Sequence, residues 1–294
     1  MSAVHTIAHE PKVDIVHQPC QLTLSTRVDS SMPFNNPPPL TFTSRRLQDR
    51  VVFITGASSG IGAAAARLFA AEGAKVALAA RRMDQLERLG AELLEAGCEA
   101  LPVECDVTDE RSVAAAIEAT VRQFGKLDGA FNNAGIFGAP APVHEIDLNI
   151  FDAVIATNLR GVVTCMKHEV QAMLANGGGA IVNTSSIGGI VGGANNAIYA
   201  ASKWGLAGLT KCAALDYARK GIRVNAIAPG PTRSGMLDAW LPTDEALAEM
   251  AASFPMNYIA DPDDMARAAL FLLTDEARWT TGVILPCEGG ASAA

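Results

Sequence analysis

The stretch VVFITGASSGIGAAAARLFAAEG, residues 51–73, decides the fold of this chain. It begins with a short apolar run, passes through a loop that contains Gly56, Gly60 and Gly62, and continues into an alanine-rich segment. Glycines in such a loop let the backbone turn tightly and approach an anion closely. The N–H groups at the start of the following helix favour a phosphate. The stretch therefore predicts a strand, a phosphate-binding turn and a helix.

The rest of the chain repeats this alternation of short apolar runs and longer amphipathic segments. The apolar runs predict strands at 51–55, 75–80, 100–105, 127–132, 179–185, 222–229 and 282–287. Helices are expected at 60–72, 84–96, 109–124, 147–175, 197–220 and 261–274, with Asp109 and Asp261 as caps. Such alternation is typical of βαβ units. We therefore expect an α/β fold of the Rossmann type: a single-domain, doubly wound, seven-stranded parallel sheet with helices on both faces.

The first part of the chain differs from the rest in composition. Residues 1–46 are polar and irregular, and the prolines at 33 and 37–39 oppose a regular helix. We interpret 1–46 as a disordered or loosely attached extension, and 47–294 as one domain that contains both the cofactor and the substrate site. Met32 offers an alternative start of the protein.

Charge and composition exclude several classes of function. The formal net charge of −8 argues against binding to nucleic acid or to an anionic membrane. No apolar stretch reaches the roughly 20 residues of a membrane span, and the N-terminus lacks the pattern of a secretory signal. The six cysteines are widely spread without metal-ligand spacing, so we expect free thiols and no metal site. We expect a cytoplasmic protein whose partners are small molecules.

The end of the second predicted strand bears on which dinucleotide would bind. An acidic residue at this place binds the 2′-hydroxyl of NAD, whereas an arginine accommodates the 2′-phosphate of NADP. The sequence there is ALAARR, with Ala80 at the expected place of the carboxylate and Arg81 directly after it. NADP(H) is therefore favoured, and NAD(H) stays possible. The alternative is that both arginines are solvated charges at a helix start, a reading that suits Arg82 better than Arg81.

The stretch YAASK, residues 199–203, places a phenol and an ammonium one helical turn apart. An alcohol or ketone that exchanges a hydride must also lose or gain a proton, and a phenol with a pKa of about 10 is a poor base at neutral pH. The ammonium of Lys203, together with an oxidised nicotinamide, is expected to lower the pKa of Tyr199. Alternatively, Tyr199 is a core residue and Lys203 a solvated one.

These features, taken in order, resemble a known family. TGASSGIG, NNAG at 132–135, TNLRG with Asn158, IVNTSS, YAASK and VNAIAPGPT are similar to the motifs of the short-chain dehydrogenases/reductases, in their compact single-domain branch. The resemblance covers about residues 47–290. It implies an NAD(P)(H)-dependent oxidoreductase, and a homotetramer built through the helices at 147–175 and 197–220. The reaction it implies is the interconversion, by hydride transfer, of a secondary alcohol and a ketone or aldehyde.

The resemblance also implies roles for individual residues. Tyr199 corresponds to the catalytic acid/base, Lys203 to its partner, and Asn158 to an asparagine that supports a proton relay. The family's spacing of thirteen residues before the tyrosine selects Ser186 as the catalytic serine, with Ser185 as the alternative. Cofactor contacts are implied at Gly56, Ser58, Ser59, Gly60, Ile61, Gly62, Arg81, Asp106, Val107, Asn133, Ala134, Gly135, Tyr199, Lys203, Pro229, Gly230 and Thr232. Asn132 is expected beside them, and Asp106 has the alternative of an ordinary cap.

The substrate is expected to contact the longest excursion beyond the strands, residues 232–258. Met236, Leu237, Trp240 and Leu241 could form an apolar lid there, although any packed amphipathic helix shows the same spacing. The neighbouring stretch SSIGGIVGGANNAIY contains no charged residue. A small or medium secondary alcohol or ketone, with a lean to an alicyclic one, is expected.

Three other functions stay open at this point. The first is a non-catalytic NADP(H)-binding regulatory protein of the same fold, for which Tyr199 and Ser186 would serve no purpose. The second is an NAD-preferring dehydrogenase, which Ala80 and Arg81 disfavour. The third is an enoyl reductase, which in this family has a wider spacing between tyrosine and lysine than the four positions found here.

Overall fold

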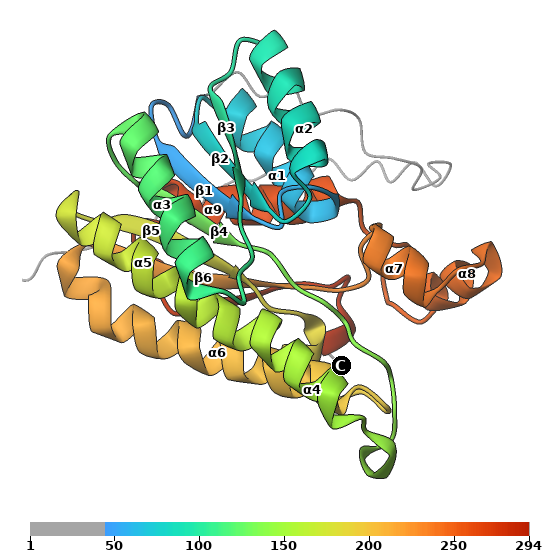
Figure 1. Cartoon of the computed structure of the whole chain (residues 1–294). Helices are drawn as coiled ribbons and strands as arrows, with labels where there is room; N and C mark the ends of the chain where they lie inside the picture. The colour runs from blue at the N-terminus through green and yellow to red at the C-terminus, as the bar shows by residue number, and fades with distance from the viewer. Residues whose placement is uncertain (1–44, 294) are drawn as a thin grey trace, which may run out of the picture. The chain divides into compact units, whose positions relative to one another are not determined.

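A computed structural model describes residues 45–293 of the chain. Its centre is a sheet of seven strands in the order β3-β2-β1-β4-β5-β6-β7 (Figure 1). The strands are β1 (Val51–Thr55), β2 (Lys75–Ala80), β3 (Ala100–Glu104), β4 (Gly129–Asn132), β5 (Gly179–Thr184), β6 (Ile222–Pro229) and β7 (Ile284–Cys287). Every neighbouring pair is parallel. The expected seven-stranded parallel sheet is confirmed.

Helices cover both faces of the sheet, as expected for a doubly wound fold. One face carries α1 (Gly60–Ala71), α2 (Met83–Glu95) and α9 (Pro262–Leu273), which pack on it through one apolar core. The other face carries α3 (Glu110–Phe124), α5 (Gly161–Ala175) and α6 (Ala197–Tyr217), with a second core. The sheet is therefore buried on both sides, which explains why its strands read as continuous apolar runs.

Two of the helix starts that the sequence predicts are confirmed by side-chain caps. The carboxylate of Asp109 accepts a hydrogen bond from the N–H of Arg111, at the start of α3. At the start of α9, Asp261 and Asp264 form a reciprocal capping box, and Pro262 occupies the first helical position. These caps satisfy N–H groups that have no partner within the helix.

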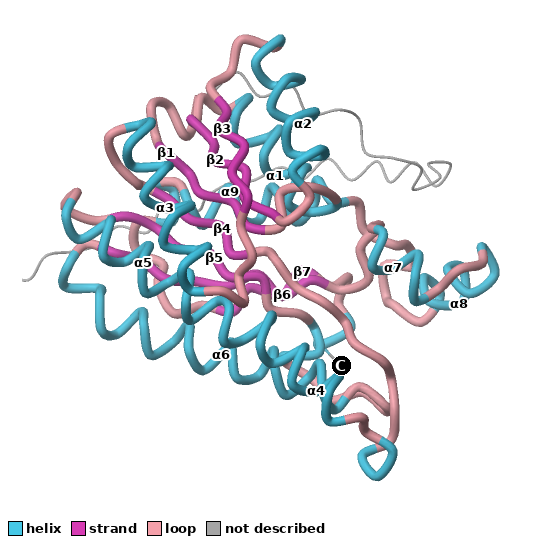
Figure 2. The backbone as a smooth tube through the Cα atoms, viewed as in Figure 1, coloured by secondary structure: helices cyan, strands magenta, loops and turns pink. Residues whose placement is uncertain are grey.

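The order of the strands reverses direction between β1 and β4. The chain first adds β2 and β3 on one side of β1, and it then returns to add β4 and the later strands on the other side. In such folds the carboxyl ends of the strands at this switch form the ligand crevice. The loops that follow these strands are drawn in pink in Figure 2, and α7 (Gly235–Trp240) and α8 (Asp244–Ala252) lie on the same side, beyond the sheet. The fold therefore brings the loops that contain the predicted site residues and the long excursion over 232–258 to the same side of the sheet.

The structure differs from the sequence prediction at the helix expected over 147–175. Here α4 (Leu148–Ile155) is followed by a π-helical segment (Ala156–Arg160) and then by α5. Asn158 lies in that π-helical segment and is fully buried. Such bulges often mark functional sites. The helix expected over 197–220 ends as an α-helix at Tyr217 and closes with a 3-10 turn.

The first described residues, from 45 onward, pack against the domain. Leu47 is buried, and the guanidinium of Arg46 binds Glu276 at 2.7 Å. Residues 1–44, and with them Met32 and most of the predicted extension, lie outside the described residues. Among the helices of the described part, none has the length and apolar character needed to cross a membrane.

Candidate active site

A cavity of about 480 Å³ opens at the carboxyl ends of the central strands. It runs from Arg81 and Asp106, beside β2 and β3, to Tyr199 and Trp240. The predicted residues that line it are Gly56, Ser58, Ser59, Gly60, Ile61, Arg81, Asp106, Val107, Asn133, Ala134, Gly135, Ser186, Tyr199, Lys203, Pro229, Gly230 and Thr232. Two predicted residues, Gly62 and Asn158, lie outside its lining and act on it through their neighbours.

The glycine loop has the form that a dinucleotide pyrophosphate requires. Gly56 has a φ of +67°, a conformation that side chains other than glycine rarely adopt. A Cβ at Gly62 would lie 2.2 Å from the carbonyl oxygen of Gly56, so only glycine lets α1 approach the loop. Ser59, which precedes α1, makes no side-chain cap. The first N–H groups of α1 therefore face the cavity side of the loop without a side-chain acceptor, and the loop fits a bound phosphate group.

Two arginines follow β2 and lie at this end of the cavity. Both Arg81 and Arg82 are exposed cavity-lining residues. The guanidinium of Arg82 donates to the hydroxyls of Ser58 and Ser59, each at 2.8 Å. The interpretation of Arg82 as a merely solvated charge is therefore wrong, because its side chain turns back onto the glycine loop.

Asp106 follows β3 and also lines the cavity. Its carboxylate accepts hydrogen bonds from the backbone N–H of Thr108 at 2.9 Å and from the hydroxyl of Thr108 at 2.7 Å. These bonds, and the nearby charge of Arg81, hold the pKa of the Asp106 carboxyl below its usual range. The cap of α3 is Asp109, so the alternative of Asp106 as an ordinary helix cap is wrong, and Asp106 forms a local turn with Thr108 instead.

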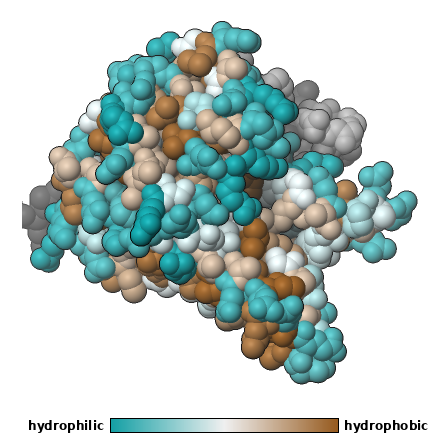
Figure 3. Space-filling view, in the orientation of Figure 1, coloured by the Kyte–Doolittle hydropathy of each residue, from teal (hydrophilic) through white to brown (hydrophobic). Residues whose placement is uncertain are grey.

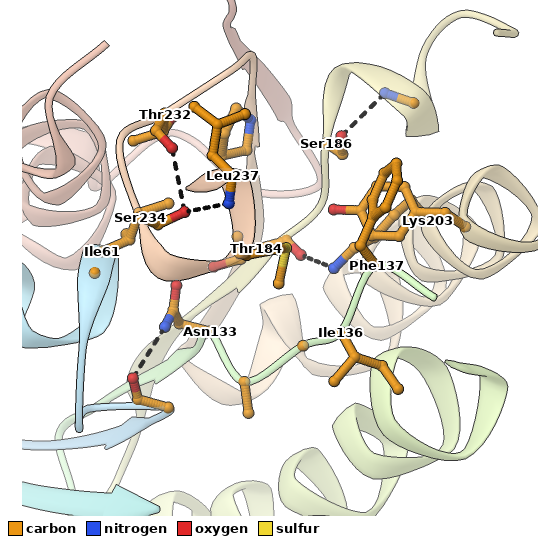
Figure 4. A pocket seen from close by; sticks show the side chains of 18 of the residues that line it. Ile61, Asn133, Ile136, Phe137, Thr184, Ser186, Lys203, Thr232, Ser234 and Leu237 are labelled. Atoms are coloured by element: carbon orange, nitrogen blue, oxygen red, sulfur yellow. Dashed lines mark hydrogen bonds between the residues drawn. The ribbon is translucent and has the colours of Figure 1, made fainter. Parts of the chain in front are cut away.

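Tyr199 and Lys203 lie one turn apart on α6 and both line the cavity. The ammonium of Lys203 is 5.5 Å from the centre of the Tyr199 ring. It donates a hydrogen bond of 2.7 Å to the carbonyl oxygen of Thr184, at the end of β5 (Figure 4). Lys203 is 4% exposed, so the interpretation of it as a solvated helix lysine is wrong.

Burial shifts the pKa values of both Tyr199 and Lys203. Burial raises the pKa of Tyr199, and hydrogen bonding with Ser186 offsets part of this. Burial also lowers the pKa of Lys203 to about 8. The lowering of the Tyr199 pKa by the ammonium together with an oxidised nicotinamide stays a prediction, since burial is the largest influence on this pKa in the protein alone. The positive charge of an oxidised nicotinamide is the further influence that a bound cofactor would add.

The structure separates the two candidate serines. The hydroxyl of Ser186 accepts a hydrogen bond from the N–H of Gly188 at 3.1 Å, and its effect on the pKa of Tyr199 places it next to the phenol. The hydroxyl of Ser185 donates to the backbone carbonyl of Lys203 at 3.3 Å and is 1% exposed. Ser186 therefore has the geometry of the reacting site, whereas Ser185 fastens the end of β5 to α6.

Asn158 fixes the loop that follows β4. Its side-chain oxygen accepts from the N–H of Ile136, and its side-chain nitrogen donates to the carbonyl of Ile136, both at 2.8 Å. The nitrogen also donates to the hydroxyl of Ser202 at 3.2 Å. The amide of Asn158 thus joins the π-helical segment, the loop after β4 and α6. Its side chain orients the walls of the cavity and does not line it.

Asn132, at the end of β4, does not line the cavity but binds the neighbouring strand, as expected of a residue that stabilises the sheet. It is 2% exposed, and its side-chain nitrogen donates to Glu169 at 3.0 Å and to Asn183 at 3.1 Å. Burial raises the pKa of Glu169 to about 8. Asn133 is the residue that faces the cavity, and its side chain donates to the carbonyl of Thr55 at 3.3 Å.

The far end of the cavity is apolar and is partly formed by the excursion over 232–258. Met236, Leu237 and Trp240 of α7 line it as the sequence predicts, whereas Leu241 does not. Ser234 caps α7 by accepting from the N–H of Leu237, and it donates to the carbonyl of Thr232 (Figure 4). Of the other lining residues, Met250 and Phe254 lie in the predicted excursion and Val191 lies in the uncharged stretch, whereas Phe137 was not predicted. Phe137 had a usable signal, because it lies two positions after the NNAG motif.

The fold and the site together define a dinucleotide-dependent oxidoreductase with a tyrosine and a lysine at the reacting end. The sequence model of a family described as "Enoyl-(Acyl carrier protein) reductase" matches residues 56–292. The similar A-factor type gamma-butyrolactone 1′-reductase of Streptomyces virginiae is 46% identical over 83% of this chain and 96% of its own. A cis-4-hydroxycyclohexanecarboxylate dehydrogenase of Sinomonas cyclohexanicum is 47% identical, with coverage of 83% and 97%.

A crystal structure of levodione reductase superposes with a TM-score of 0.82 at 40% identity, covering 85% of this chain and 100% of the other. The chain belongs to the short-chain dehydrogenase/reductase family. It is an NAD(P)(H)-dependent oxidoreductase that interconverts a secondary alcohol and its carbonyl compound. Similar structures contain NAD+ or NADP. The description of the matching family model names an enoyl reductase, but the relatives are alcohol dehydrogenases and ketone reductases.

Proposed function

We propose that this protein is an NADP(H)-dependent dehydrogenase/reductase of a small, neutral, alicyclic secondary alcohol and its ketone, with Tyr199 as the acid/base. The observation that carries the proposal is the position of Tyr199. Its ring lies in the cavity next to Ser186 and 5.5 Å from the Lys203 ammonium. A protein that only bound a dinucleotide would not need this buried arrangement.

The residues of the chain divide the work of proton transfer. NADPH supplies the hydride when the ketone is reduced. The Tyr199 hydroxyl donates a proton to the ketone oxygen, or removes one from the alcohol in the other direction. Ser186 donates a hydrogen bond to the same oxygen and holds it against Tyr199. Lys203, with a pKa of about 8, carries a positive charge at neutral pH and favours the phenolate that forms.

The glycine loop, Asp106, Asn133, Gly135 and Gly230 would hold the dinucleotide along the cavity. Asn158 keeps the loop after β4 in place, through its two bonds to Ile136. Thr232, at the nicotinamide end, is fastened by its hydroxyl to the carbonyl of Gly230 at 3.1 Å. We propose these residues for positioning, and Tyr199, Ser186 and Lys203 for catalysis.

The preference for NADP(H) rests on Arg81 and Arg82. Ala80 replaces the carboxylate that would repel a phosphate, and Arg82 with Ser58 and Ser59 supplies donors beside it. A planar guanidinium is well suited to bind a phosphate in two places. Arg81→Ala and Arg82→Ala are each expected to raise the KM for NADPH by about tenfold or more, with little change for NADH. Arg88→Ala, an exposed arginine of α2 that pairs with Asp84, is the control. Equal effects on both dinucleotides would contradict the proposal.

The neutral character of the proposed substrate follows from the lining of the cavity. Among the described residues, the charged ones that line it besides Lys203 are Arg81, Arg82 and Asp106, all at the adenosine end. The relative from Sinomonas is named for a hydroxycyclohexane that carries a carboxylate, and the reacting end of this cavity offers no additional cation for such a group. We therefore propose cyclohexanone-like ketones over ketones that carry an acid.

The experiment that tests the function is NADPH oxidation by the purified protein over a panel of ketones. The panel holds cyclohexanone, 4-oxocyclohexanecarboxylate, 2-hexanone and an enoyl thioester. Turnover of cyclohexanone above the carboxylated ketone is expected. Tight NADPH binding with no turnover would favour the non-catalytic regulator, and turnover of the thioester alone would favour an enoyl reductase.

We further propose a homotetramer, because two helices expose apolar residues on the same side of the sheet. On α6, Trp204 is 53% and Leu215 82% exposed, and on α4, Leu148 is 70% exposed. Figure 3 shows apolar surface gathered over the region of α4. Light scattering should give four subunits, and Trp204→Glu should lower that number; a monomeric parent protein would overturn the proposal.

A cytoplasmic location is proposed from the cysteines. The five cysteines in the described part, Cys98, Cys105, Cys165, Cys212 and Cys287, are all free thiols. Free thiols of this number suit a reducing compartment. Fractionation of the source cells, with activity followed in each fraction, tests this.

A further inference from the structure

Three aromatic side chains from three different elements form a row at the reacting end of the cavity. The ring of Phe137, in the loop after β4, has its centre 4.9 Å from that of Tyr199 on α6. Its centre is also 4.8 Å from the ring of Trp240 on α7. All three residues line the cavity. Phe137 thus connects the acid/base to the helix that covers the site.

The backbone around Phe137 is held on both sides. The preceding residue, Ile136, has both its N–H and its carbonyl bonded to the side chain of Asn158. The following residue, Gly138, has a φ of +84°, and a Cβ there would lie 2.8 Å from Cγ2 of Val154 on α4. The turn is therefore tightly placed against α4, and the backbone on both sides of Phe137 holds its ring at the wall of the cavity.

The surroundings of this wall are apolar. Val191, Met236 and Leu237 complete the lining near it, and none of them offers a charge or a strong hydrogen bond. Figure 4 shows Phe137 on the side of Lys203 and Thr184, with Leu237 on the opposite side. A substrate whose oxygen lies at Tyr199 and Ser186 would therefore extend its carbon skeleton along the aromatic row.

We propose that Phe137 and Trp240 determine specificity by selecting a neutral alicyclic ring over an open chain of the same carbon number. A ring that rests on fixed, flat side chains loses little internal freedom on binding. An open chain must lose rotational freedom about several single bonds to make the same contact, and each loss costs free energy. Aromatic side chains also give the largest contact area per residue. This inference rests on the proposed function, because it assumes a ketone bound at Tyr199.

The test compares cyclohexanone with 2-hexanone, both with NADPH, in the full-length protein. The quantity measured is the ratio of the two kcat/KM values. Phe137→Ala is expected to lower this ratio by about tenfold or more, and Trp240→Ala by a smaller factor. Phe137→Leu, which keeps an apolar side chain without a flat ring, should give an intermediate ratio. The matched controls are Phe271→Ala on α9 and Trp279→Ala, two partly or fully exposed aromatic residues outside the cavity. Their ratios should equal that of the parent protein.

The outcomes separate this inference from the proposed function. If the parent protein reduces both ketones and Phe137→Ala lowers both rates equally, the aromatic row does not select rings and the inference is overturned, while the proposed function stands. If the parent protein reduces neither ketone although NADPH binds, both fail. If Phe137→Ala does not fold, Phe137→Leu decides, and an unchanged ratio in that folded variant overturns the inference.

Discussion

The two ends of the cavity are built in different ways. The phosphate end consists of the loop from Gly56 to Gly62, one short segment whose form is fixed by backbone geometry, and of the two arginines after β2. The reacting end takes Phe137, Ser186, Tyr199 and Trp240 from four segments spread over more than a hundred residues. The glycine loop is a local turn with no space for a side chain at Gly62, whereas the reacting end is assembled from side chains of distant segments.

Because of this difference, the two ends of the cavity should respond differently to substitutions. At the phosphate end one added methyl group at Gly62 would meet backbone, which cannot move away cheaply. At the reacting end, Met236 and Trp240 are 41% and 37% exposed, so their replacement leaves the packed core untouched. The glycine loop of the phosphate end should therefore not accept an added side chain at Gly62, whereas the reacting end should keep its fold while its chemistry or its specificity changes.

Loss of the Tyr199 hydroxyl should have the largest effect, and it should be confined to the reacting end. Tyr199→Phe is expected to lower kcat for the ketone by about 10²–10⁴-fold, the usual contribution of a positioned acid/base. NADPH affinity, measured by the change in its fluorescence, should stay the same. Tyr217→Phe removes a phenol from the end of the same helix, outside the cavity, and should leave both quantities unchanged. If Tyr199→Phe weakened NADPH binding as much as turnover, the two ends would not be separable.

A methyl group at Gly62 should act on the opposite end. Gly62→Ala places a Cβ 2.2 Å from the Gly56 oxygen, so the loop must shift and NADPH affinity should fall by at least about tenfold. Thermal unfolding should show a loss of about 1–3 kcal/mol in stability. Gly208→Ala adds the same methyl group inside α6 where no atom lies within 4 Å, so NADPH affinity should not change and stability should rise by up to about 1 kcal/mol, because alanine favours a helix over glycine. Unaltered NADPH affinity in Gly62→Ala would show that the close approach of α1 to the loop is dispensable.

Glu169 belongs to neither end and should affect stability alone. Burial raises its pKa from the ordinary 4.5 to about 8, so the folded protein holds this proton more tightly than the unfolded chain does. The free energy of unfolding therefore falls as the pH rises from about 4.5 to 8, and it stops falling above that. Between pH 6 and 8 this loss should be about 1–2 kcal/mol.

Glu169→Gln removes the titrating group and keeps a side chain of the same shape beside Asn132. Urea unfolding at pH 6 and pH 8 gives the free energy of unfolding of both proteins. The decrease in this free energy from pH 6 to pH 8 should be smaller in the variant than in the parent protein by about 1–2 kcal/mol. The NADPH affinity of the folded variant should not change. The same pH dependence in both proteins would mean that Glu169 is not held protonated by the fold.

The features that could be predicted from the sequence are those that depend on residues close together in the chain. The seven strands, their parallel arrangement and the phosphate-binding glycines could be predicted because each depends on residues that are neighbours in the chain. The tyrosine and lysine could be predicted for the same reason, since one helical turn joins them. The selection of Ser186 over Ser185 depended on family spacing, and the structure supplies the reason: Ser185 points its hydroxyl at the Lys203 carbonyl.

The remaining features depend on tertiary contacts that no local pattern encodes. Arg82 read as a solvated charge because its partners, Ser58 and Ser59, lie more than twenty residues earlier in the chain. No role was predicted for Phe137, because its contact with Trp240 depends on where α7 lies. Asn132 and Asn133 are adjacent in one motif, but the side chain of Asn132 binds Glu169 in the core whereas Asn133 lines the cavity.

The smallest expected effect lies at the outer edge of the reacting end, where Met250 of α8 touches the cavity. None of the residues of α8 is buried, so truncation of one side chain there removes a contact without opening the core. Met250→Ala should raise the KM for cyclohexanone by about threefold and leave kcat and NADPH affinity unchanged, because a few methylene groups contribute little binding energy at an exposed edge. Glu249→Ala, on the same helix and outside the cavity lining, is the control. A large fall in kcat for Met250→Ala would mean that α8 takes part in ordering Tyr199, and the reacting end would then be as rigid as the phosphate end.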